Sequence, residues 1–297
     1  MFPALVLTTL FQAAPLTPMP LGRYEGVALV HGAKVYLIGG TSARSSQEGR
    51  VDIYDTTRNT WSTAKPLPTP RTFLCGTELD GKLYVIGGTG EHGRTRVVER
   101  YDPTTDRWER LTDLNTSRTH VAAVAFQGKI YVLGGFLGKE EEGRTGTRSV
   151  EVYDPATNRW SNGPPLPLGL HGHVAVVLGG KIHVLGDDDF HFALEGQEWK
   201  PRARHPVGLF AEGAVVDGKL YVTGGSSADF RPTWRYEPRT DRWTRGADSP
   251  TPRYHFQLAT VGDKIYTFGG VKVTDGPGPR CLSKVDCYDP AKNRWRE

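Results

Sequence analysis

Four arginines occupy matching places in this sequence, because each stands sixteen positions before the first glycine of a Gly-Gly pair. They are Arg23, Arg71, Arg118 and Arg253. A guanidinium group offers a planar fork of donors that binds carboxylate, sulfate or phosphate through two bonds. If the four side chains gather at one opening of the fold, they predict a basic site for an acidic peptide or a small anion. The alternative is that each arginine pairs with an Asp or Glu of a neighbouring copy of the pattern as part of the scaffold, since a residue that recurs at one position is often structural.

The residues beside these arginines differ from copy to copy, which makes them better candidates for a specific site. Histidine titrates near neutral pH, and together with a carboxyl group it can act in acid–base catalysis. The alternative is that they are half-buried strand residues with ordinary hydrogen bonds, and no catalytic residue is assigned. The candidates for ligand binding, besides the four arginines, are Tyr24, Glu25, His120, His171, Glu212, Tyr254 and His255.

The arginines belong to a unit that recurs six times along the chain. Five copies carry a double glycine, at 39–40, 87–88, 134–135, 224–225 and 269–270, and a sixth reads Gly186-Asp187. One tryptophan follows in each copy, at Trp61, Trp108, Trp160, Trp199, Trp243 and Trp295. A Tyr-Asp or Tyr-Glu pair precedes it in five copies. A period in this range is typical of a repeat architecture.

Each copy predicts four short strands. In the second copy we expect strands at 74–79, 82–86 and 97–101 and a fourth beginning near Trp108. Asp80-Gly81 lies between two apolar runs and predicts a tight hairpin, because a type I′ turn needs a positive φ at both central residues. Asp102-Pro103 predicts a turn between the third and fourth strands. The fold class is therefore all-β.

The double glycine, the Tyr-Asp pair and the following tryptophan resemble the kelch family over roughly residues 13–297. The resemblance implies a single domain over residues 1–297, a six-bladed β-propeller in which every blade is a four-stranded sheet. We expect the blades at roughly 23–67, 71–114, 118–166, 170–204, 208–249 and 253–297. The chain stops soon after Trp295, so we expect residues 10–20 to supply a strand to the last blade and close the ring.

Strand directions alternate within a blade, so the loops can be sorted between two faces of the disc. Connections from the second to the third strand and from one blade to the next share one face, where the four arginines would ring the channel. Further arginines fall in the second-to-third-strand loops of this face: Arg44, Arg50, Arg94, Arg96, Arg144, Arg148, Arg231 and Arg280. The sequence thus predicts a basic mouth.

The resemblance implies a non-catalytic binding module, because the corresponding face of kelch proteins commonly binds partner peptides. An alternative also comes from the family: the bacterial sialic-acid mutarotases are of similar size and use an arginine-lined mouth with acidic residues. An isomerase acting on a sugar acid at the same mouth is therefore the second hypothesis, and whether the chain is an enzyme stays open.

Composition excludes several other classes of protein. The net charge of +4 on 297 residues calls for neither nucleic acid nor a membrane surface, and no apolar run reaches the roughly 18 residues that a membrane span needs. We expect a soluble monomer without cofactor or metal. Asp187, Asp188 and Asp189 could hold a divalent cation, although three adjacent aspartates are more often a solvated loop.

The apolar stretch before residue 12 is either part of the segment that closes the ring or a secretory signal. A secretory signal needs a basic front, and no Lys or Arg precedes Arg23. We therefore expect a cytoplasmic protein, with secretion as the alternative. The three cysteines are Cys75, Cys281 and Cys287, and the last two could form a bridge if the chain folds back.

Overall fold

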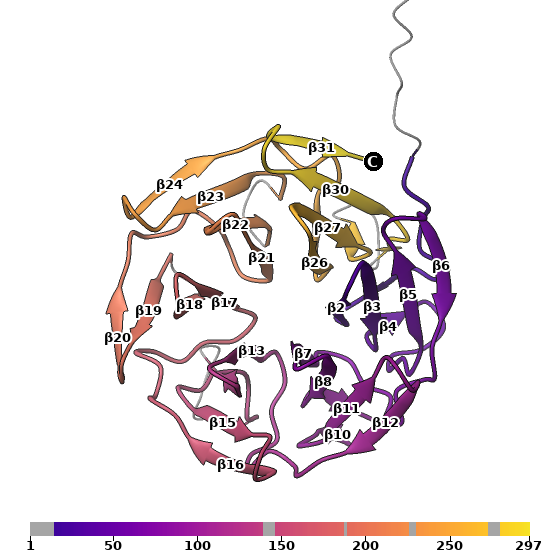
Figure 1. The fold of residues 1–297 in the computed structure, drawn as a ribbon, viewed down its shortest axis with the longest axis vertical. Helices are drawn as coiled ribbons and strands as arrows, with labels where there is room; N and C mark the ends of the chain where they lie inside the picture. The colour runs from indigo at the N-terminus through magenta and orange to yellow at the C-terminus, as the bar shows by residue number, and fades with distance from the viewer. Residues whose placement is uncertain (1–14, 139–145, 187–188, 226–229, 273–279) are drawn as a thin grey trace, which may run out of the picture.

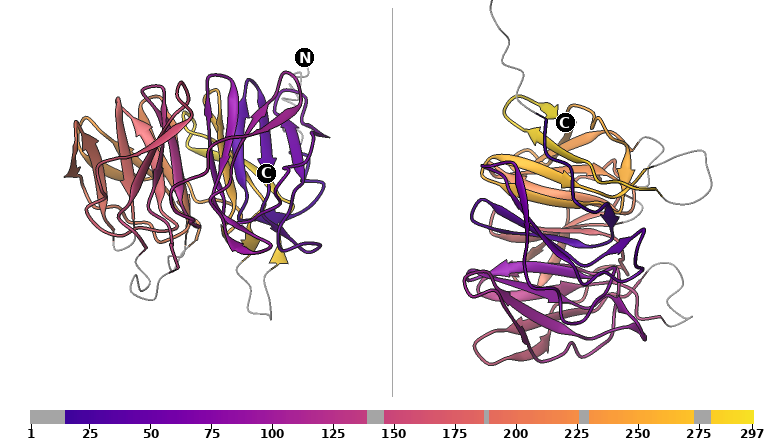
Figure 2. Two further views of the ribbon diagram at one scale, coloured as in Figure 1. Left: turned by 90° about the horizontal axis from the view of Figure 1, so that it is seen from below. Right: turned by 90° about the vertical axis from the view of Figure 1, so that its right-hand side faces the viewer.

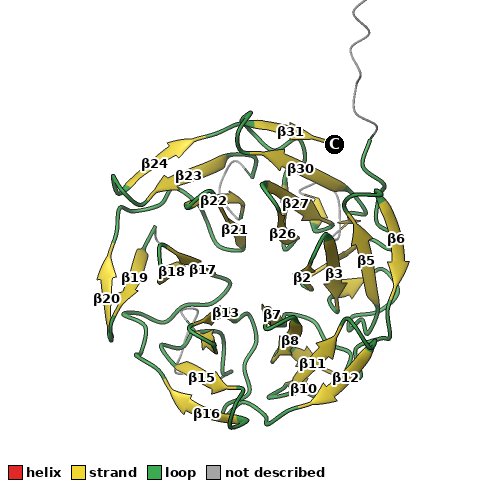
Figure 3. Ribbon diagram, in the orientation of Figure 1, coloured by secondary structure: helices red, strands yellow, loops and turns green. Residues whose placement is uncertain are grey.

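The computed structural model describes residues 15–138, 146–186, 189–225, 230–272 and 280–297. Within these residues every regular element is a strand (Figure 3). Six four-stranded antiparallel sheets stand around a common axis, with their first strands innermost (Figure 1). The fold is the six-bladed β-propeller that the repeat predicts. No helix in the described part of the chain is long and apolar enough to cross a membrane.

The strands of each blade run from the axis outwards in chain order, which gives all six blades the same topology. Blade 1 holds β2 (Val27–His31), β3 (Lys34–Ile38), β5 (Val51–Asp55) and β6 (Thr60–Thr63). Blade 2 holds β7 (Cys75–Leu79), β8 (Lys82–Ile86), β11 (Val98–Asp102) and β12 (Arg107–Arg110). Blade 3 holds β13 (Ala122–Phe126), β14 (Lys129–Leu133), β15 (Val150–Asp154) and β16 (Arg159–Asn162).

The second half of the chain continues the pattern. Blade 4 holds β17 (Val174–Leu178), β18 (Lys181–Leu185), β19 (His191–Glu195) and β20 (Glu198–Pro201). Blade 5 holds β21 (Ala211–Val216), β22 (Lys219–Gly224), β23 (Thr233–Glu237) and β24 (Arg242–Arg245). Blade 6 holds β26 (Gln257–Val261), β27 (Lys264–Phe268), β30 (Val285–Asp289) and β31 (Arg294–Arg296).

Short strand pairs tie the loops of one face together. β1 (Arg23–Tyr24) pairs with β4 (Thr41–Ser42), and β9 (Thr89–Gly90) pairs with β10 (Gly93–Arg94). β25 (Arg253–Tyr254) pairs with β28 (Val271–Lys272), which pairs with β29 (Arg280–Cys281). The segments that enter a blade and those that leave its second strand therefore lie on one side. We call this side the mouth face and the opposite side the hairpin face.

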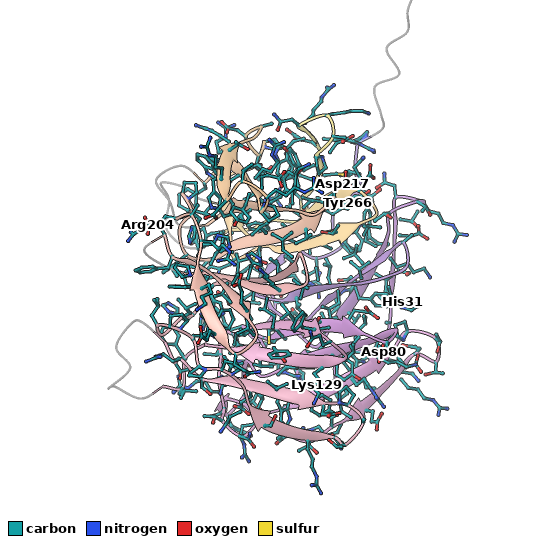
Figure 4. The ribbon with its side chains drawn as sticks, turned by 60° about the vertical axis from the view of Figure 1, so that its left-hand side comes forward. His31, Asp80, Lys129, Arg204, Asp217 and Tyr266 are labelled. Atoms are coloured by element: carbon teal, nitrogen blue, oxygen red, sulfur yellow. The ribbon has the colours of Figure 1, made fainter. Side chains whose placement is uncertain are left out.

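The views of the disc separate the two faces. Figure 2 shows the disc edge-on, with the strands of the blades running between its two faces. In Figure 4, His31 and Asp80, beside inner hairpin turns, lie on the side opposite Arg204, which belongs to the connection between blades 4 and 5. Asp80 and Gly81 have φ values of 51° and 74°, which confirms the predicted hairpin geometry.

The hydrophobic core lies between neighbouring blades. One cluster joins Leu29, Tyr36 and Ile38 of blade 1 to Leu83, Val85 and Tyr101 of blade 2. Equivalent clusters fill the other junctions around the ring. Each sheet thus buries both faces against its neighbours, so the blades are stable as a ring and not singly.

The tyrosine and the tryptophan of the repeat belong to one clasp between blades. In blade 2 the Tyr101 hydroxyl donates to Asp106 Oδ1 at 2.7 Å, and the Trp108 indole N–H donates to the carbonyl of Lys65 in blade 1 at 3.0 Å. Asp106 also accepts the N–H of Lys65 at 3.0 Å. Asp106 has a φ of 51°, in the left-handed region that Asn and Asp tolerate best after glycine. All six tryptophans donate in this way to the preceding segment.

The double glycine allows the next blade to approach closely. A Cβ on Gly39 would lie 2.8 Å from the carbonyl oxygen of Arg71, and the φ of Gly39 is 68°. The N–H of Gly40 donates to that same carbonyl at 3.0 Å. Any side chain at position 39 would push blade 2 away, which explains the glycine.

The predicted ring closure by an N-terminal strand is not confirmed. The outer strand of blade 6 is β31, from the C-terminal repeat itself, and residues 15–22 form no strand. Residues 10–14 lie outside the described part. The N-terminal segment nevertheless occupies an equivalent place, because Met19 N donates to Ser283 O at 2.7 Å as Leu67 N donates to Gly49 O in blade 1. Trp61 donates to Thr17 O at 3.0 Å, so the clasp between blades 6 and 1 uses this segment.

Candidate functional site

The four repeat arginines are buried, and each is paired within its own blade. Arg71 is 0 % exposed, and its Nη1 lies 2.5 Å from Glu99 Oε2. Its remaining donors reach the carbonyls of Gly87, Val85 and Thr69. Burial lowers the pKa of Arg71, and the adjacent carboxylate of Glu99 opposes that shift. The guanidinium group of Arg71 therefore bonds to its own blade and is not presented to a ligand.

The other three arginines repeat this arrangement. Arg23 lies 2.7 Å from Asp52, Arg118 lies 2.5 Å from Glu151, and Arg253 pairs with Asp286. All are at most 2 % exposed. The expectation that Arg23, Arg71, Arg118 and Arg253 line an open basic mouth is wrong, because each side chain turns into its blade toward a carboxylate on the third strand.

The sequence carries a signal for this pairing, because acidic residues recur together with the arginines. The second residue of the third strand is acidic in the four blades that have the arginine: Asp52, Glu99, Glu151 and Asp286. In blades 4 and 5 that residue is Phe192 or Trp234, and the position of the arginine holds Leu170 or Gly208. The charges are thus present together or absent together.

A ring of six residues narrows the channel at the mouth face. Each lies two positions after the blade's opening residue, and each has a φ between 51° and 60°. The N–H of one member donates to the carbonyl of the member in the preceding blade, at 2.9 to 3.2 Å for the five bonds from Glu25 to Phe210. We call this the neck ring; its members are Glu25, Phe73, His120, Gly172, Phe210 and His255.

Aromatic side chains of the neck ring pack across the channel. Phe73 stacks on His120 with ring centroids 3.9 Å apart, and Phe210 lies against His255 at 4.3 Å. The two pairs face each other, with ring centroids about 6 Å apart between His120 and Phe210 and between Phe73 and His255. Beside them is a cavity of about 100 Å³, which we call the neck cavity.

Two glutamates of the candidate set line the neck cavity. The Glu25 side chain is 8 % exposed, accepts hydrogen bonds from Thr41 and Thr72 at 3.3 and 3.1 Å, and lies 3.9 Å from His255 Nδ1. Burial raises the pKa of Glu25 to about 7, against the effect of the two hydroxyl donors. Burial also raises the pKa of Glu212 to about 8.

The histidines of the neck are uncharged at neutral pH. Burial lowers the pKa of His120 to about 3 and that of His255 to about 4. None of the described residues that line the neck cavity is a lysine or an arginine. The structure thus brings Glu25, Glu212, His120 and His255 together, in a site that is weakly charged and aromatic and not basic.

The remaining candidates lie around the mouth. His171 is buried, with its ring 4.0 Å from that of Phe136. The ring of Tyr254 lies between those of Phe230 and His255, with centroid distances of 6.0 and 4.9 Å. Tyr24 is half-buried on β1. Burial raises the pKa of Tyr24, helped by the nearby Glu25.

Exposed arginines do occur on the mouth face, farther from the axis. We call five of them the rim arginines: Arg44, Arg94, Arg96, Arg148 and Arg231, which are exposed in the connections between second and third strands. Arg50 is instead paired with Asp52. Arg144 and the side chain of Arg280 lie outside the described residues.

Metal and thiol chemistry find little support in the described part of the chain. No group of three or more His, Cys, Asp or Glu side chains there could hold a metal ion. Asp187 and Asp188 lie outside that part, and Asp189 pairs with Arg204 at 2.8 Å. Cys75, Cys281 and Cys287 are free thiols.

Six blades joined by tryptophan clasps around a narrowed channel define a repeat propeller. Residues 8–187 match the KLHDC2/KLHL20/DRC7 Kelch-repeats domain, and residues 209–250 and 252–297 each match the Kelch motif. The chain belongs to the kelch-repeat family.

Similar proteins carry this domain within longer chains. Kelch-like protein 25 of Xenopus tropicalis is 28 % identical over 295 residues, and Kelch-like protein 38 of Rattus norvegicus is 29 % identical over 297 residues. Each comparison covers 96 % of this chain but 42 % of the relative. The solved "Structure of YjhT" superposes with a TM-score of 0.79 at 17 % identity, covering 94 % of this chain and 98 % of that one, and supports the fold alone.

Proposed function

We propose that this chain is a non-catalytic kelch-type interaction module that binds an acidic peptide or a small anion through the rim arginines. The observation that carries the proposal is the exposure of five arginines on loops of one face, while the four repeat arginines are buried. Arginine is enriched in the centres of protein interfaces, where its guanidinium pairs with carboxylates. The Kelch-like relatives support an interaction module of this type.

The surroundings of the rim suit a partner chain better than a buried small molecule. Half-buried aromatic side chains lie on the same face, including Phe136, Phe230 and Tyr254. Aromatic groups beside arginines are typical of binding hot spots. A depression of about 540 Å³ also opens beside Arg44 and Arg50 at the edge of blade 1, wide enough for part of a peptide.

The proposal is tested by reversing charges on one face at a time. A fluorescent oligoglutamate peptide serves as the probe in an anisotropy titration. R94E/R96E removes two rim arginines, and R58E/R239E makes the same charge change at exposed turns of the hairpin face. We expect the rim variant to weaken binding at least about tenfold and the control to change it less than about twofold. Equal losses in both variants would mean that only the net charge matters, and would refute a rim site.

The sugar-acid isomerase remains the second candidate, and one observation favours it. The pKa values of about 7 and 8 for Glu25 and Glu212 suit proton transfer near neutral pH. Among the described residues no arginine lines the neck cavity, which speaks against recognition of a carboxylate by these residues. The check is exchange between the anomers of sialic acid followed by NMR: a rate that E25Q and E212Q reduce supports the enzyme, and a rate equal to that of buffer removes it.

A further inference from the structure

The neck cavity holds acidic groups whose hydrogen-bonding capacity is not met by the protein. Among the described residues, Glu212 on β21 has no hydrogen-bond or ion-pair partner. From the described residues Glu25 receives the hydroxyls of Thr41 and Thr72, and Nδ1 of His120 is buried without a partner among them. Buried polar groups are nearly always satisfied by protein, water or ligand. Glu25 and Glu212 are half-buried, so their carboxyl oxygens stay open to a molecule in the cavity that donates hydrogen bonds.

The charge of the lining indicates what kind of donor fits. Two carboxyl groups line the cavity, and its lining holds no lysine or arginine from the part of the chain that the structure describes. The neighbouring imidazoles of His120 and His255 are neutral at pH 7 and add no positive charge. A ligand that brings its own positive charge would form ion pairs with carboxyl groups that otherwise lose solvation without compensation.

The shape and the rings restrict the ligand further. A cavity of about 100 Å³ has room for a chain of roughly four to six heavy atoms. Phe73 and Phe210 present apolar rings to an alkyl stem, and an aromatic face also attracts a cation. We propose that the neck cavity binds a primary alkylammonium group, carried either by a small amine or by a lysine side chain of a partner segment.

This inference is independent of the rim arginines, because it concerns other residues and a ligand of opposite charge. The probe is n-butylammonium chloride, titrated calorimetrically at pH 7.5, with n-butanol as a neutral control of the same length. We expect a Kd of about 1–10 mM for the amine and at least tenfold weaker binding of the alcohol. Equal binding of both would show a neutral site for hydroxyl compounds and overturn the proposal. No heat from either ligand up to about 100 mM would overturn it as well.

Matched variants locate the site within the channel. E212Q keeps the shape of the side chain and removes its charge, and we expect at least a tenfold loss of affinity for butylammonium. E78Q makes the same change on β7 at the hairpin end of the channel, and we expect no effect. E25Q is a second test within the neck, and the thermal unfolding of all variants confirms that they fold. Undiminished binding by E212Q and E25Q together would place the amine elsewhere.

Proton release gives a readout that a purely apolar site would not produce. A bound cation lowers the pKa of Glu212 and that of Glu25. The immediate neighbours of Glu25 are His255, Thr41 and Thr72. Binding at pH 7 should therefore release protons, seen as a binding heat that depends on the ionisation enthalpy of the buffer. The affinity should rise about three- to tenfold from pH 6 to pH 8. Proton uptake, or buffer-independent heat with a flat pH profile, would contradict an ammonium ligand.

A third probe distinguishes a free amine from the lysine side chain of a partner as the source of the ammonium group. Nα-acetyl-lysine amide carries the same alkylammonium chain on a peptide unit. If it binds at least as tightly as butylammonium, the site accepts the side chain of a partner. If it binds at least tenfold more weakly, the neck admits only free amines. An equal loss of both probes in E212Q assigns them to one site.

Discussion

Arg71 Nη1 lies 2.5 Å from Glu99 Oε2, and their side chains are 0 % and 3 % exposed. Both members of the pair make further hydrogen bonds. Arg71 donates to three backbone carbonyls, and Glu99 accepts the hydroxyl of Thr69. The same pair recurs in blades 1, 3 and 6. These arginines fix the entry of each of the four blades against its own third strand.

Removing one partner of this pair should destabilise the ring strongly. R71M leaves the Glu99 carboxylate buried without its cation, so we expect a loss of about 3–5 kcal/mol in the free energy of unfolding. R71M/E99L removes both charges, and its loss should be smaller by about 1–3 kcal/mol. Urea denaturation of the three proteins measures both values. A loss below about 1 kcal/mol for R71M would show that the pair is not structural.

The clasp between blades predicts a cost at Asn59, which joins blade 1 to the N-terminal segment. Its Oδ1 accepts the Tyr54 hydroxyl at 2.6 Å and the Thr17 N–H at 2.7 Å. N59G keeps the positive φ and loses both bonds, so we expect destabilisation by about 1–3 kcal/mol. N59D restores the acceptor found as Asp106 in blade 2 and should cost less than about 1 kcal/mol. Equal stability of N59G and wild type would contradict the clasp.

His173 occupies an apolar position and should make the protein sensitive to acid. Its ring packs near Gly134, as Leu74 packs near Gly39, and neither ring nitrogen has a hydrogen-bond partner. Burial lowers the pKa of His173 to about 3. The unfolded chain therefore binds its proton first, and stability falls as the pH drops from about 6.5 toward 3. H173L should raise stability by about 1–2 kcal/mol at pH 7 and flatten that part of the pH profile. Stability that H173L lowers at both pH 7 and pH 4 would contradict this.

Glu212 should make the folded protein less stable as the pH rises, which is the opposite of the effect of His173. Its pKa of about 8 in the folded protein exceeds the ordinary value near 4.5, so the folded state keeps a proton that the unfolded chain has released. Its contribution is destabilising, and it grows from about pH 4.5 up to about pH 8. E212Q should therefore raise the melting temperature at pH 8.5 more than at pH 5, which calorimetry can follow. A melting temperature that E212Q changes equally at both pH values would show an unshifted carboxyl group.

The repeat determined most of the fold from sequence, because hairpins and tryptophan wedges depend on local residues. Asp80-Gly81 and Trp108 lie where the pattern predicts them. Whether an arginine side chain turns outward or inward depends on a residue about thirty positions later, as with Arg71 and Glu99. The repeat pattern therefore did not predict that the four arginines are buried. The backbone bonds of the neck ring link residues such as Phe73 and His120 that no local pattern connects. β31 replaced the predicted N-terminal strand because three residues after Asn293 suffice to pair with β30.

Binding of the oligoglutamate peptide at the rim arginines can be located by hydrogen–deuterium exchange. We expect slower exchange on binding in 41–50 and 89–96, which hold Arg44, Arg94 and Arg96 on the mouth face. The turns at 56–59 and 103–106 on the hairpin face should exchange as in the free protein. Protection confined to those turns, or spread evenly over both faces, would contradict a binding site at the rim.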